Sequence, residues 1–249
     1  MDEIPLLRKC LGLLYSLVCY LFSMLVLAYF VGFIGPLEVP KDINSGPPTA
    51  WYFAVPINVL LISLFALQHS GMARRGFKQF WLQWVPAPIE RATYVLFSSL
   101  ALSLLFVLWQ PIPLTLWDVQ AQPARGLIEA LYWLGWIILV LATFLLSHFE
   151  LFGLKQAFDA FRPHPGEASA FKTPWLYRLV RHPLYLGFVM SFWATPHMTV
   201  GHLLFAGVST LYILMGTLLE EKDLVQLFGE QYRQYQRKVG MLLPFVGRR

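Results

Sequence analysis

Five stretches of this sequence lack Asp, Glu, Lys and Arg over about the length that a helix needs to cross a bilayer. Four have ordinary lengths for membrane spans and occupy residues 11–35, 50–68, 92–109 and 130–147. The first exceeds the apolar core of a signal peptide, about 7–15 residues, so we expect it to be retained as a helix. The pattern predicts an integral membrane protein built from helices.

The composition excludes the main alternatives. Of the 249 residues, 57% are hydrophobic and 13% are charged, which leaves too little polar surface for an ordinary soluble fold or for disorder. A formal charge of +5 would suit nucleic acid, but the basic residues lie in the gaps between apolar stretches rather than on one stripe. We expect a lipid bilayer as partner, no nucleic acid, and a single domain over residues 1–249.

The fifth uncharged stretch, residues 182–219, is too long for one membrane helix. Its 38 residues would reach about 57 Å, nearly twice the hydrocarbon thickness. Pro196 lies near its middle, lacks a backbone donor and disfavours helix at Thr195. We predict a hairpin of two helices, with one kinked helix as the alternative. The expected fold is an all-α bundle of four spans, a C-terminal helical hairpin and a cytoplasmic tail helix.

The distribution of positive charge predicts the orientation. All but two of the 19 Lys and Arg residues lie on the side of the N-terminus, and the two opposite loops contain only Lys41 and Arg125. Since cytoplasmic loops carry the excess of basic residues, we expect a multi-pass protein of the inner (cell) membrane with both termini in the cytoplasm.

Polar residues gather at the two ends of the predicted hairpin. Its start reads Arg-His-Pro-Leu-Tyr-Leu-Gly at residues 181–187, where Pro183 in a first helical turn leaves backbone donors free for a carboxylate or phosphate. Gly187 would let a flat ligand approach the backbone. The hairpin ends at Glu220 and Glu221.

If the hairpin closes, its basic start and acidic end lie side by side, and the pocket suits a zwitterionic or cationic ligand. In the alternative interpretation, Arg181 and Lys222 merely mark the membrane edge, and Glu220 and Glu221 are solvated. The spacing alone does not choose between these interpretations.

A family resemblance adds to this pattern. Arg-His-Pro-x-Tyr-x-Gly, a hydrophobic hairpin, Glu-Glu, Phe-Gly-x-x-Tyr-x-x-Tyr from Phe228, and Pro244 together resemble the membrane methyltransferases. That superfamily includes isoprenylcysteine carboxyl methyltransferase and phospholipid methyltransferases, which use S-adenosylmethionine without a Rossmann domain. The resemblance covers residues 177–244.

The whole chain resembles a narrower group, the bacterial methanethiol S-methyltransferases. The segments that carry this resemblance are residues 64–70, 90–94, 148–153 and 192–196. The resemblance implies S-adenosylmethionine-dependent methylation of methanethiol, a small thiol, to dimethyl sulfide, with a cofactor region over residues 148–244. The cofactor residues expected from the hairpin and the family-like motif are Tyr177, Arg181, His182, Pro183, Tyr185, Gly187, Glu220 and Glu221.

Methyl transfer to a thiol requires a dry site and a base, because the thiolate is the nucleophile. Glu150 and His148 end the fourth span, and their i, i+2 spacing lets only one of them face a pocket. Glu150 is a direct or water-relayed base in this interpretation, whereas His148 is otherwise a boundary histidine bonded to a helix carbonyl. Asn58 and His69 in the second span are further candidates, with an interhelical hydrogen bond and an interfacial position as their respective alternatives.

Other functions fit less well. The sequence has no HExxH, cysteine-rich or carboxylate-rich cluster, so we expect no metal, and bis-histidine haem is a minor alternative. A methyltransferase for a larger lipid-like substrate is the enzymatic rival. A proton-coupled transporter using Asn58, His69 and Glu150 as a relay is the rival from another class.

The tail after residue 219 predicts an amphipathic helix. Leu224, Phe228, Tyr232, Tyr235 and Val239 recur at helical spacing and form one apolar-aromatic face, while Gly229 offers a bend. We expect the tail to fold over the cofactor and exclude water, with a helix resting on the membrane surface as the alternative.

Overall fold

The computed structural model describes residues 5–47, 49–162 and 171–244. Five of its helices are long and apolar enough to cross a membrane, which confirms the predicted all-α membrane fold. They are α1 (Leu6–Ile34), α2 (Trp51–Ala73), α4 (Ala87–Leu108), α5 (Ala124–Leu146) and α9 (Val200–Phe228).

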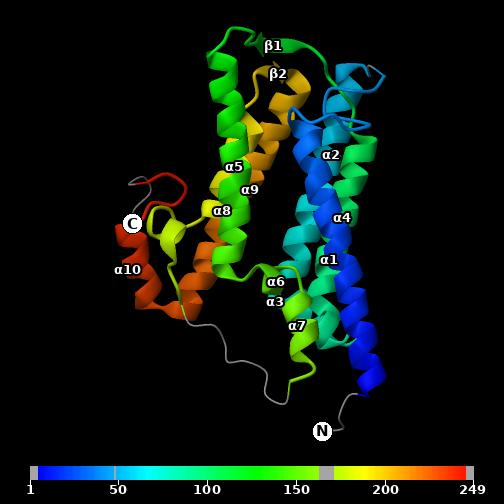
Figure 1. Cartoon of the computed structure of the whole chain (residues 1–249), viewed down its shortest axis with the longest axis vertical. Helices are drawn as coiled ribbons and strands as arrows, with labels where there is room; N and C mark the ends of the chain where they lie inside the picture. The colour runs from blue at the N-terminus through cyan, green and yellow to red at the C-terminus, as the bar shows by residue number, and fades with distance from the viewer. Residues whose placement is uncertain (1–4, 48, 163–170, 245–249) are drawn as a thin grey trace.

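Shorter elements connect and close these spans. The shorter helices are α3 (Arg75–Trp81), α6 (His148–Leu151), α7 (Leu154–Asp159), the 3-10 turn η1 (Trp175–Arg178), α8 (Pro183–Trp193) and α10 (Glu230–Lys238). Two short strands, β1 (Thr115–Asp118) and β2 (His197–Thr199), pair antiparallel. The first turn of α1 and the C-terminal end of α9 lie toward the same end of the bundle, which we call the inner end, and β1 and β2 close the opposite, outer end (Figure 1).

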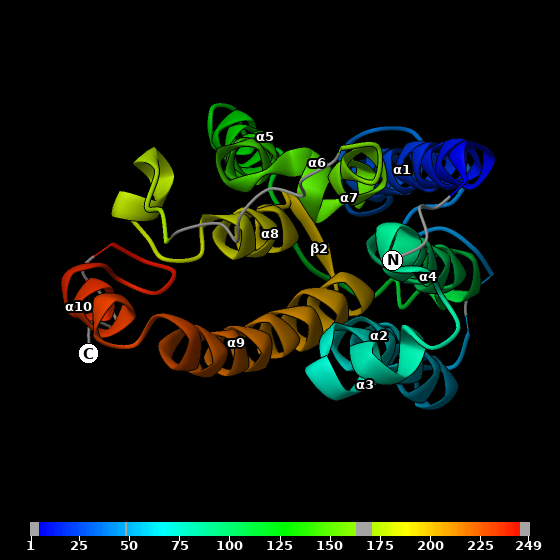
Figure 2. The ribbon, with the colours of Figure 1, turned by 90° about the horizontal axis from the view of Figure 1, so that it is seen from below.

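The helices form two groups. Helix α4 packs against α1 and α2, and α8 packs against α5. Helix α9 joins the groups because it contacts both α2 and α8 and then runs obliquely to α10 (Figure 2). An aromatic core lies between the groups: Phe30 contacts Phe106, Trp136, Phe192 and Phe205, with ring centroids 5.4–5.8 Å apart.

The fifth uncharged stretch is a hairpin, as predicted, but its arms are unequal. Helix α8 has 11 residues, about 16 Å, and cannot cross the bilayer, whereas α9 has 29 residues. Helix α8 ends three residues before Pro196, and Thr199 then caps α9 by accepting a hydrogen bond from the backbone N–H of His202 (3.1 Å). The turn therefore follows from the proline and from the cap.

Gly187 has a packing role in the structure. A Cβ atom at Gly187 would lie 2.5 Å from the carbonyl oxygen of Gly135, and one at Gly135 would lie 2.7 Å from the carbonyl oxygen of Gly187. The two backbones touch at this point, so Gly187 permits α8 to pack closely on α5. The cofactor role predicted for Gly187 stays a prediction beside this packing role.

The predicted tail helix and its bend are both present. Gly229 has a φ angle of +59° and separates α9 from α10. Tyr232 is buried, and Phe171 packs its ring against Phe228, Tyr232 and Tyr235 at centroid distances of 5.2–5.8 Å. The tail therefore folds back on the protein through its aromatic face.

Candidate active site

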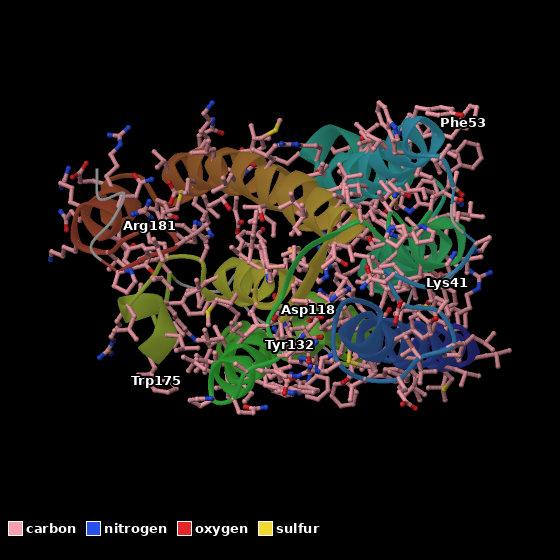
Figure 3. All side chains as sticks on the ribbon, turned by 90° about the horizontal axis from the view of Figure 1, so that it is seen from above. Lys41, Phe53, Asp118, Tyr132, Trp175 and Arg181 are labelled. Carbon is pink, nitrogen blue, oxygen red and sulfur yellow. The ribbon has the colours of Figure 1, made fainter. Side chains whose placement is uncertain are left out.

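A buried ion pair ties the two ends of the hairpin together. Arg181 Nε donates to Glu221 Oε1 at 2.5 Å, and the side chains are 0% and 2% exposed. The basic start and the acidic end of the hairpin thus lie side by side, as the closed-hairpin interpretation expected. Figure 3 shows Arg181 against α10.

The same pair holds the tail. Arg181 Nη1 donates to the carbonyl oxygens of Gln236 (3.2 Å) and Val239, and Gln236 Nε2 donates to Glu221 Oε2 (3.0 Å). The backbone N–H of Arg181 donates to the carbonyl of Gly240 at 2.8 Å. We call Arg181, Glu221 and Gln236 the tail clamp, because these contacts bind the tail to the hairpin.

The tail clamp also uses backbone donors before α8. The backbone N–H groups of Arg181 and His182 donate to the carbonyls of Gly240 and Met241. The side chains of Arg181 and Glu221 are buried and bond to protein groups. Their geometry favours a structural role at the site over direct ligand contact.

A second polar group lies beside the clamp. His182 is buried, with its Nε2 atom 3.3 Å from Glu221 Oε1, whereas Glu220 is accessible. Tyr185 Oη donates to Glu220 Oε2 at 2.8 Å, and His182 Nδ1 lies 3.8 Å from the same oxygen. The ring of His182 stacks on that of Tyr185 with centroids 5.6 Å apart, while the Glu220 side chain remains 45% exposed. We call His182, Tyr185 and Glu220 the mouth residues.

The first turn of α8 adds backbone donors to the mouth residues. Pro183 begins the helix, and in the part of the chain that the structure describes no acceptor pairs with the backbone N–H groups of Leu184 and Tyr185. Burial first and the Glu220 carboxylate second raise the pKa of the Tyr177 phenol. Its hydroxyl group therefore stays protonated at neutral pH.

A cavity opens next to the tail clamp. It has a volume of about 310 Å³, and its lining residues are Glu221, Lys222, Val225, Gln226 and Gln236. A smaller cavity of about 150 Å³ lies at the outer end, near the β1–β2 pair, and includes Asp42, Arg125, Glu129 and His197 in its lining.

Of the four candidate bases, His69 lies in a polar cluster within the bundle. Tyr94 Oη lies 2.9 Å from its Nε2 atom and 3.0 Å from its Nδ1 atom, and Nδ1 is also 3.1 Å from Ser98 Oγ. Arg91 places its guanidinium carbon 4.7 Å from the centre of the Tyr94 ring and donates from Nε to the carbonyl of Leu151 (2.8 Å). The His69 position thus joins α2 to α4.

Helices α8 and α9 contribute phenols to the same region. Tyr212 Oη is hydrogen-bonded to Ser70 Oγ at 3.0 Å, and the Phe65 ring lies between His69 and Tyr212, 5.3 Å and 6.3 Å from their centroids. Phe65 of α2 and Tyr185 of α8 both pack against the same buried hydrophobic core, so the His69 cluster and the mouth residues both border the core of the bundle.

Sequence reasoning missed Tyr94, Ser98 and Tyr212 as site residues. All three fall inside uncharged stretches that read as apolar core. Tyr94 belongs to a segment that carried the family resemblance, residues 90–94, and that was its only signal. Gln236 was missed for a different reason: the helical spacing of the tail marks only its apolar and aromatic positions, and Gln236 is not one of them.

His148 and Glu150 do not join this cluster. His148 is buried between Tyr20 Oη (3.0 Å) and Thr143 Oγ1 (2.9 Å), and burial lowers the pKa of its imidazole. Glu150 accepts a hydrogen bond from Lys155 Nζ at 2.8 Å, which lowers the pKa of its carboxyl group. Both side chains have partners at the inner end of α5.

Asn58 lies toward the outer end. Its Nδ2 donates to the carbonyl of Gln110 (2.7 Å), and its Oδ1 accepts from the backbone N–H of Gln110 (2.9 Å). This is the interhelical hydrogen bond given above as the alternative to a catalytic role. Among the described residues, no group of three or more His, Cys, Asp or Glu side chains is placed to hold a metal ion.

Comparison with known proteins now gives the family. The family model "Protein of unknown function (DUF1295)" matches residues 60–239. The chain is 61% identical over 236 residues to "Methanethiol S-methyltransferase" of Pseudomonas sp. (strain GM41(2012)), covering 95% of this chain and 91% of that protein. It is 59% identical to "Methanethiol S-methyltransferase" of Pseudomonas deceptionensis, covering 96% and 92% respectively.

A more distant similarity also extends over most of the chain. "Nurim" of Xenopus laevis is 28% identical, covering 93% of this chain and 88% of that protein. No solved structure matches the chain. The identities near 60% over almost the full length, together with the hairpin and its polar mouth, show that the chain belongs to the methanethiol S-methyltransferase family.

Proposed function

We propose that the protein methylates methanethiol to dimethyl sulfide with S-adenosylmethionine as the methyl donor. The observation that carries the proposal is the position of the mouth residues, where a helix N-terminus, an imidazole, a phenol and an accessible carboxylate converge. The relatives named methanethiol S-methyltransferase support the choice of thiol.

The mouth residues fit the polar parts of this donor. The backbone N–H groups of Leu184 and Tyr185 suit a carboxylate, because they offer donors at a positive helix end. The His182 ring, whose Nε2 atom is 3.3 Å from Glu221 Oε1, positions this end of the site. The Glu220 carboxylate suits an ammonium group or ribose hydroxyls. Pro183 sets the first turn, and Tyr177 adds an aromatic surface near Glu220. Arg181 and Glu221 would support this site from behind by holding the tail.

The bound donor would supply a methyl group on a sulfonium. The protein must provide a thiolate and exclude water, since water weakens the electrostatic interactions of the site. We assign His69 as the final acceptor of the thiol proton, because it lies inside the bundle with Tyr94 Oη 3.0 Å from its Nδ1 atom and 2.9 Å from its Nε2 atom. Asn58, His148 and Glu150 are proposed to be structural.

The thiol assay tests the function directly. Purified protein in detergent is incubated with methyl-labelled S-adenosylmethionine and a panel of thiols, and volatile thioethers are measured. We expect label in dimethyl sulfide when methanethiol is supplied. Label only in a prenylcysteine ester would assign the larger lipid-like substrate, and no label in any product would overturn the methyltransferase proposal for this chain.

Calorimetry tests the cofactor site separately. We expect His182→Ala and Glu220→Ala to weaken binding of the product S-adenosylhomocysteine by about tenfold or more each, equivalent to about 1.4 kcal/mol. Glu129→Ala is the matched control, because Glu129 pairs with Arg125 and both line the cavity at the outer end of the bundle. Unchanged affinity in the folded mouth variants would remove both residues from the site.

The tail and the topology form part of the same proposal. We propose that the inner end faces the cytoplasm and that the tail shields the cofactor. Reporter fusions at residues 3 and 247 should both give cytoplasmic signals. Truncation after Leu219 should leave an inserted bundle with little cofactor affinity, because it removes Glu221 and Gln236 of the tail clamp. Normal binding by the truncated protein would make the tail a membrane anchor only.

A further inference from the structure

We infer that His182 is a positioning residue that couples cofactor binding at the mouth residues to docking of the tail. The inference rests on the proposed function, because it takes Glu220 as the group that meets the methyl donor. It adds that the mouth residues and the tail clamp act on each other through one side chain. The evidence is the set of contacts that meet at this histidine.

The His182 ring lies between the carboxylates of two consecutive residues on α9. Its Nε2 atom is 3.3 Å from Glu221 Oε1, and its Nδ1 atom is 3.8 Å from Glu220 Oε2. Glu221 is buried in the tail clamp, whereas the Glu220 side chain is 45% exposed. One ring therefore lies against both the closed interior of the site and its accessible side.

The backbone of His182 is bonded to the tail as well. Its N–H group donates to the carbonyl of Met241 at 3.2 Å, and its own carbonyl accepts from the N–H of Leu186 at 3.0 Å. The residue is thus the N-cap of α8 and also a partner of the tail. Because the ring is attached to this backbone, a tail that leaves the clamp releases one of the bonds that fix the ring.

Tyr185 extends these contacts to the proposed ligand position. Its ring stacks on that of His182, with centroids 5.6 Å apart and an interplanar angle of 19°, and its hydroxyl group donates to Glu220 Oε2 at 2.8 Å. A docked tail therefore holds His182, and His182 and Tyr185 together hold the carboxylate of Glu220. A ligand that needs Glu220 in this position binds better while the tail is docked.

The tail has a hinge that lets it leave the clamp. Gly229 separates α9 from α10 with a φ angle of +59°, and a Cβ atom there would meet none of the described atoms within 4 Å. Beyond this hinge, Gln236 Nε2 donates to Glu221 Oε2 at 3.0 Å, and Arg181 Nη1 donates to the Gln236 carbonyl at 3.2 Å. The docked and the released tail are the two states that the ligand selects between.

Coupling of this kind acts in both directions with the same magnitude. Bound ligand should make the tail harder to release, and a weakened tail clamp should weaken ligand binding. Because both effects pass through His182, both should disappear when the two nitrogens of its ring are removed.

Hydrogen exchange measures the effect of the ligand on the tail. In the wild-type protein in detergent, saturating S-adenosylhomocysteine should slow amide exchange over residues 230–241 by about fivefold or more. His182→Phe keeps a ring that can stack on Tyr185 and removes both nitrogens, so a saturating ligand concentration should slow its exchange by less than about twofold. His197→Phe changes a histidine of the outer end whose side chain is 45% exposed, and this matched control should keep the full wild-type slowing.

A double-mutant cycle measures the effect of the tail on the ligand. Gln236→Leu removes the bond to Glu221 from the tail side, and calorimetry should show about fivefold weaker binding of S-adenosylhomocysteine. In the His182→Phe background the same change should weaken binding by less than about twofold. Gln234→Leu, at an exposed position of the same helix, is the control and should leave the affinity unchanged in both backgrounds. Independent losses that multiply would overturn the coupling.

The outcomes separate the coupling from the function on which it rests. If His182→Phe shows no cooperative unfolding transition, His182→Asn replaces it with the same expected results, since asparagine caps a helix but is too short to reach both carboxylates. Wild-type slowing of tail exchange in the His182 variant would overturn the coupling. A wild-type protein that binds S-adenosylhomocysteine without any change in tail exchange would also overturn the coupling alone. A wild-type protein that binds no S-adenosylhomocysteine would overturn the proposed function itself.

Discussion

The two ends of the bundle are both polar, but they use their polar groups differently. At the outer end, Asn58 bonds both backbone groups of Gln110, Thr199 Oγ1 donates to Asn44 Oδ1 (2.7 Å), and Lys41 Nζ donates to two carbonyls at the end of α4 (2.6 and 2.9 Å). At the inner end, the polar groups of the tail clamp are likewise bonded to other protein groups. The mouth residues beside it differ, since Glu220 remains accessible and no acceptor among the described residues pairs with the backbone N–H groups of Leu184 and Tyr185.

This contrast shows that a polar residue at the membrane boundary does not by itself indicate a ligand-binding site. Asn58 and Glu220 are both polar side chains on long apolar helices, but only Glu220 keeps bonding capacity for a ligand. Unused donors and acceptors beside a charged group are the better indicator, because buried polar groups are otherwise satisfied by the protein.

The largest expected effect comes from removing the buried ion pair of the tail clamp. Arg181→Met leaves the buried Glu221 carboxylate without its cation, and we expect a loss of about 3–5 kcal/mol in the free energy of unfolding. Thermal unfolding in detergent measures it. Arg233→Met, which removes an exposed cation 3.8 Å from Glu230, is the control and should change stability by less than about 0.5 kcal/mol. Equal effects of the two variants would show that the clamp is not buried in solution.

The contact between α8 and α5 can be tested next. Gly187→Ala forces a Cβ atom to within 2.5 Å of the Gly135 carbonyl oxygen, and we expect a destabilisation of about 1–3 kcal/mol. Gly216→Ala on α9 is the matched control: a Cβ there meets nothing within 4 Å, so stability should hold or rise by about 0.5–1 kcal/mol. If Gly187→Ala were stable and yet lost the cofactor, the predicted ligand role of Gly187 would be supported.

Asn58→Ala tests whether the polar groups at the outer end have a structural role only. The variant leaves the backbone N–H and C=O of Gln110 without their side-chain partner, which should cost about 1–3 kcal/mol of stability. The ratio kcat/KM for methanethiol should change less than twofold, because the mouth residues and the His69 cluster are untouched. A large loss of kcat in a protein of near-normal stability would place Asn58 in the catalytic machinery.

The smallest effect concerns Glu150 and acid. Lys155 lowers the pKa of Glu150 in the folded state below its ordinary 4.5, so the folded protein takes up this proton less readily than the unfolded chain. The stabilisation is present above about pH 4.5 and is lost as the pH falls through the lowered pKa. Both side chains are more than 40% exposed, which limits the contribution to about 0.5 kcal/mol. In Glu150→Gln, the difference from wild type should vanish in acid, and a constant difference across pH would contradict this account.

The sequence by itself determined the membrane character, the spans, the hairpin and the tail. Each depends on a property that acts locally: the length of an uncharged stretch, the missing donor of Pro196, and the helical spacing from Leu224 to Val239 with Gly229 as its bend. The resemblance also predicted the family to which the chain belongs. The closed-hairpin interpretation predicted that Arg181 and Glu221 lie close together.

Only the tertiary structure decided what each polar residue does. Glu220 and Glu221 are neighbours in the sequence, but successive side chains on a helix point about 100° apart, so one faces Arg181 in the interior and the other remains accessible. Gly187 reads as an opening for a ligand, and only the packed structure shows that α5 lies against it. Tyr94 reads as core until His69 of another helix meets its hydroxyl group. These roles depend on contacts between helices far apart in the chain, and such contacts leave no periodic pattern in the sequence.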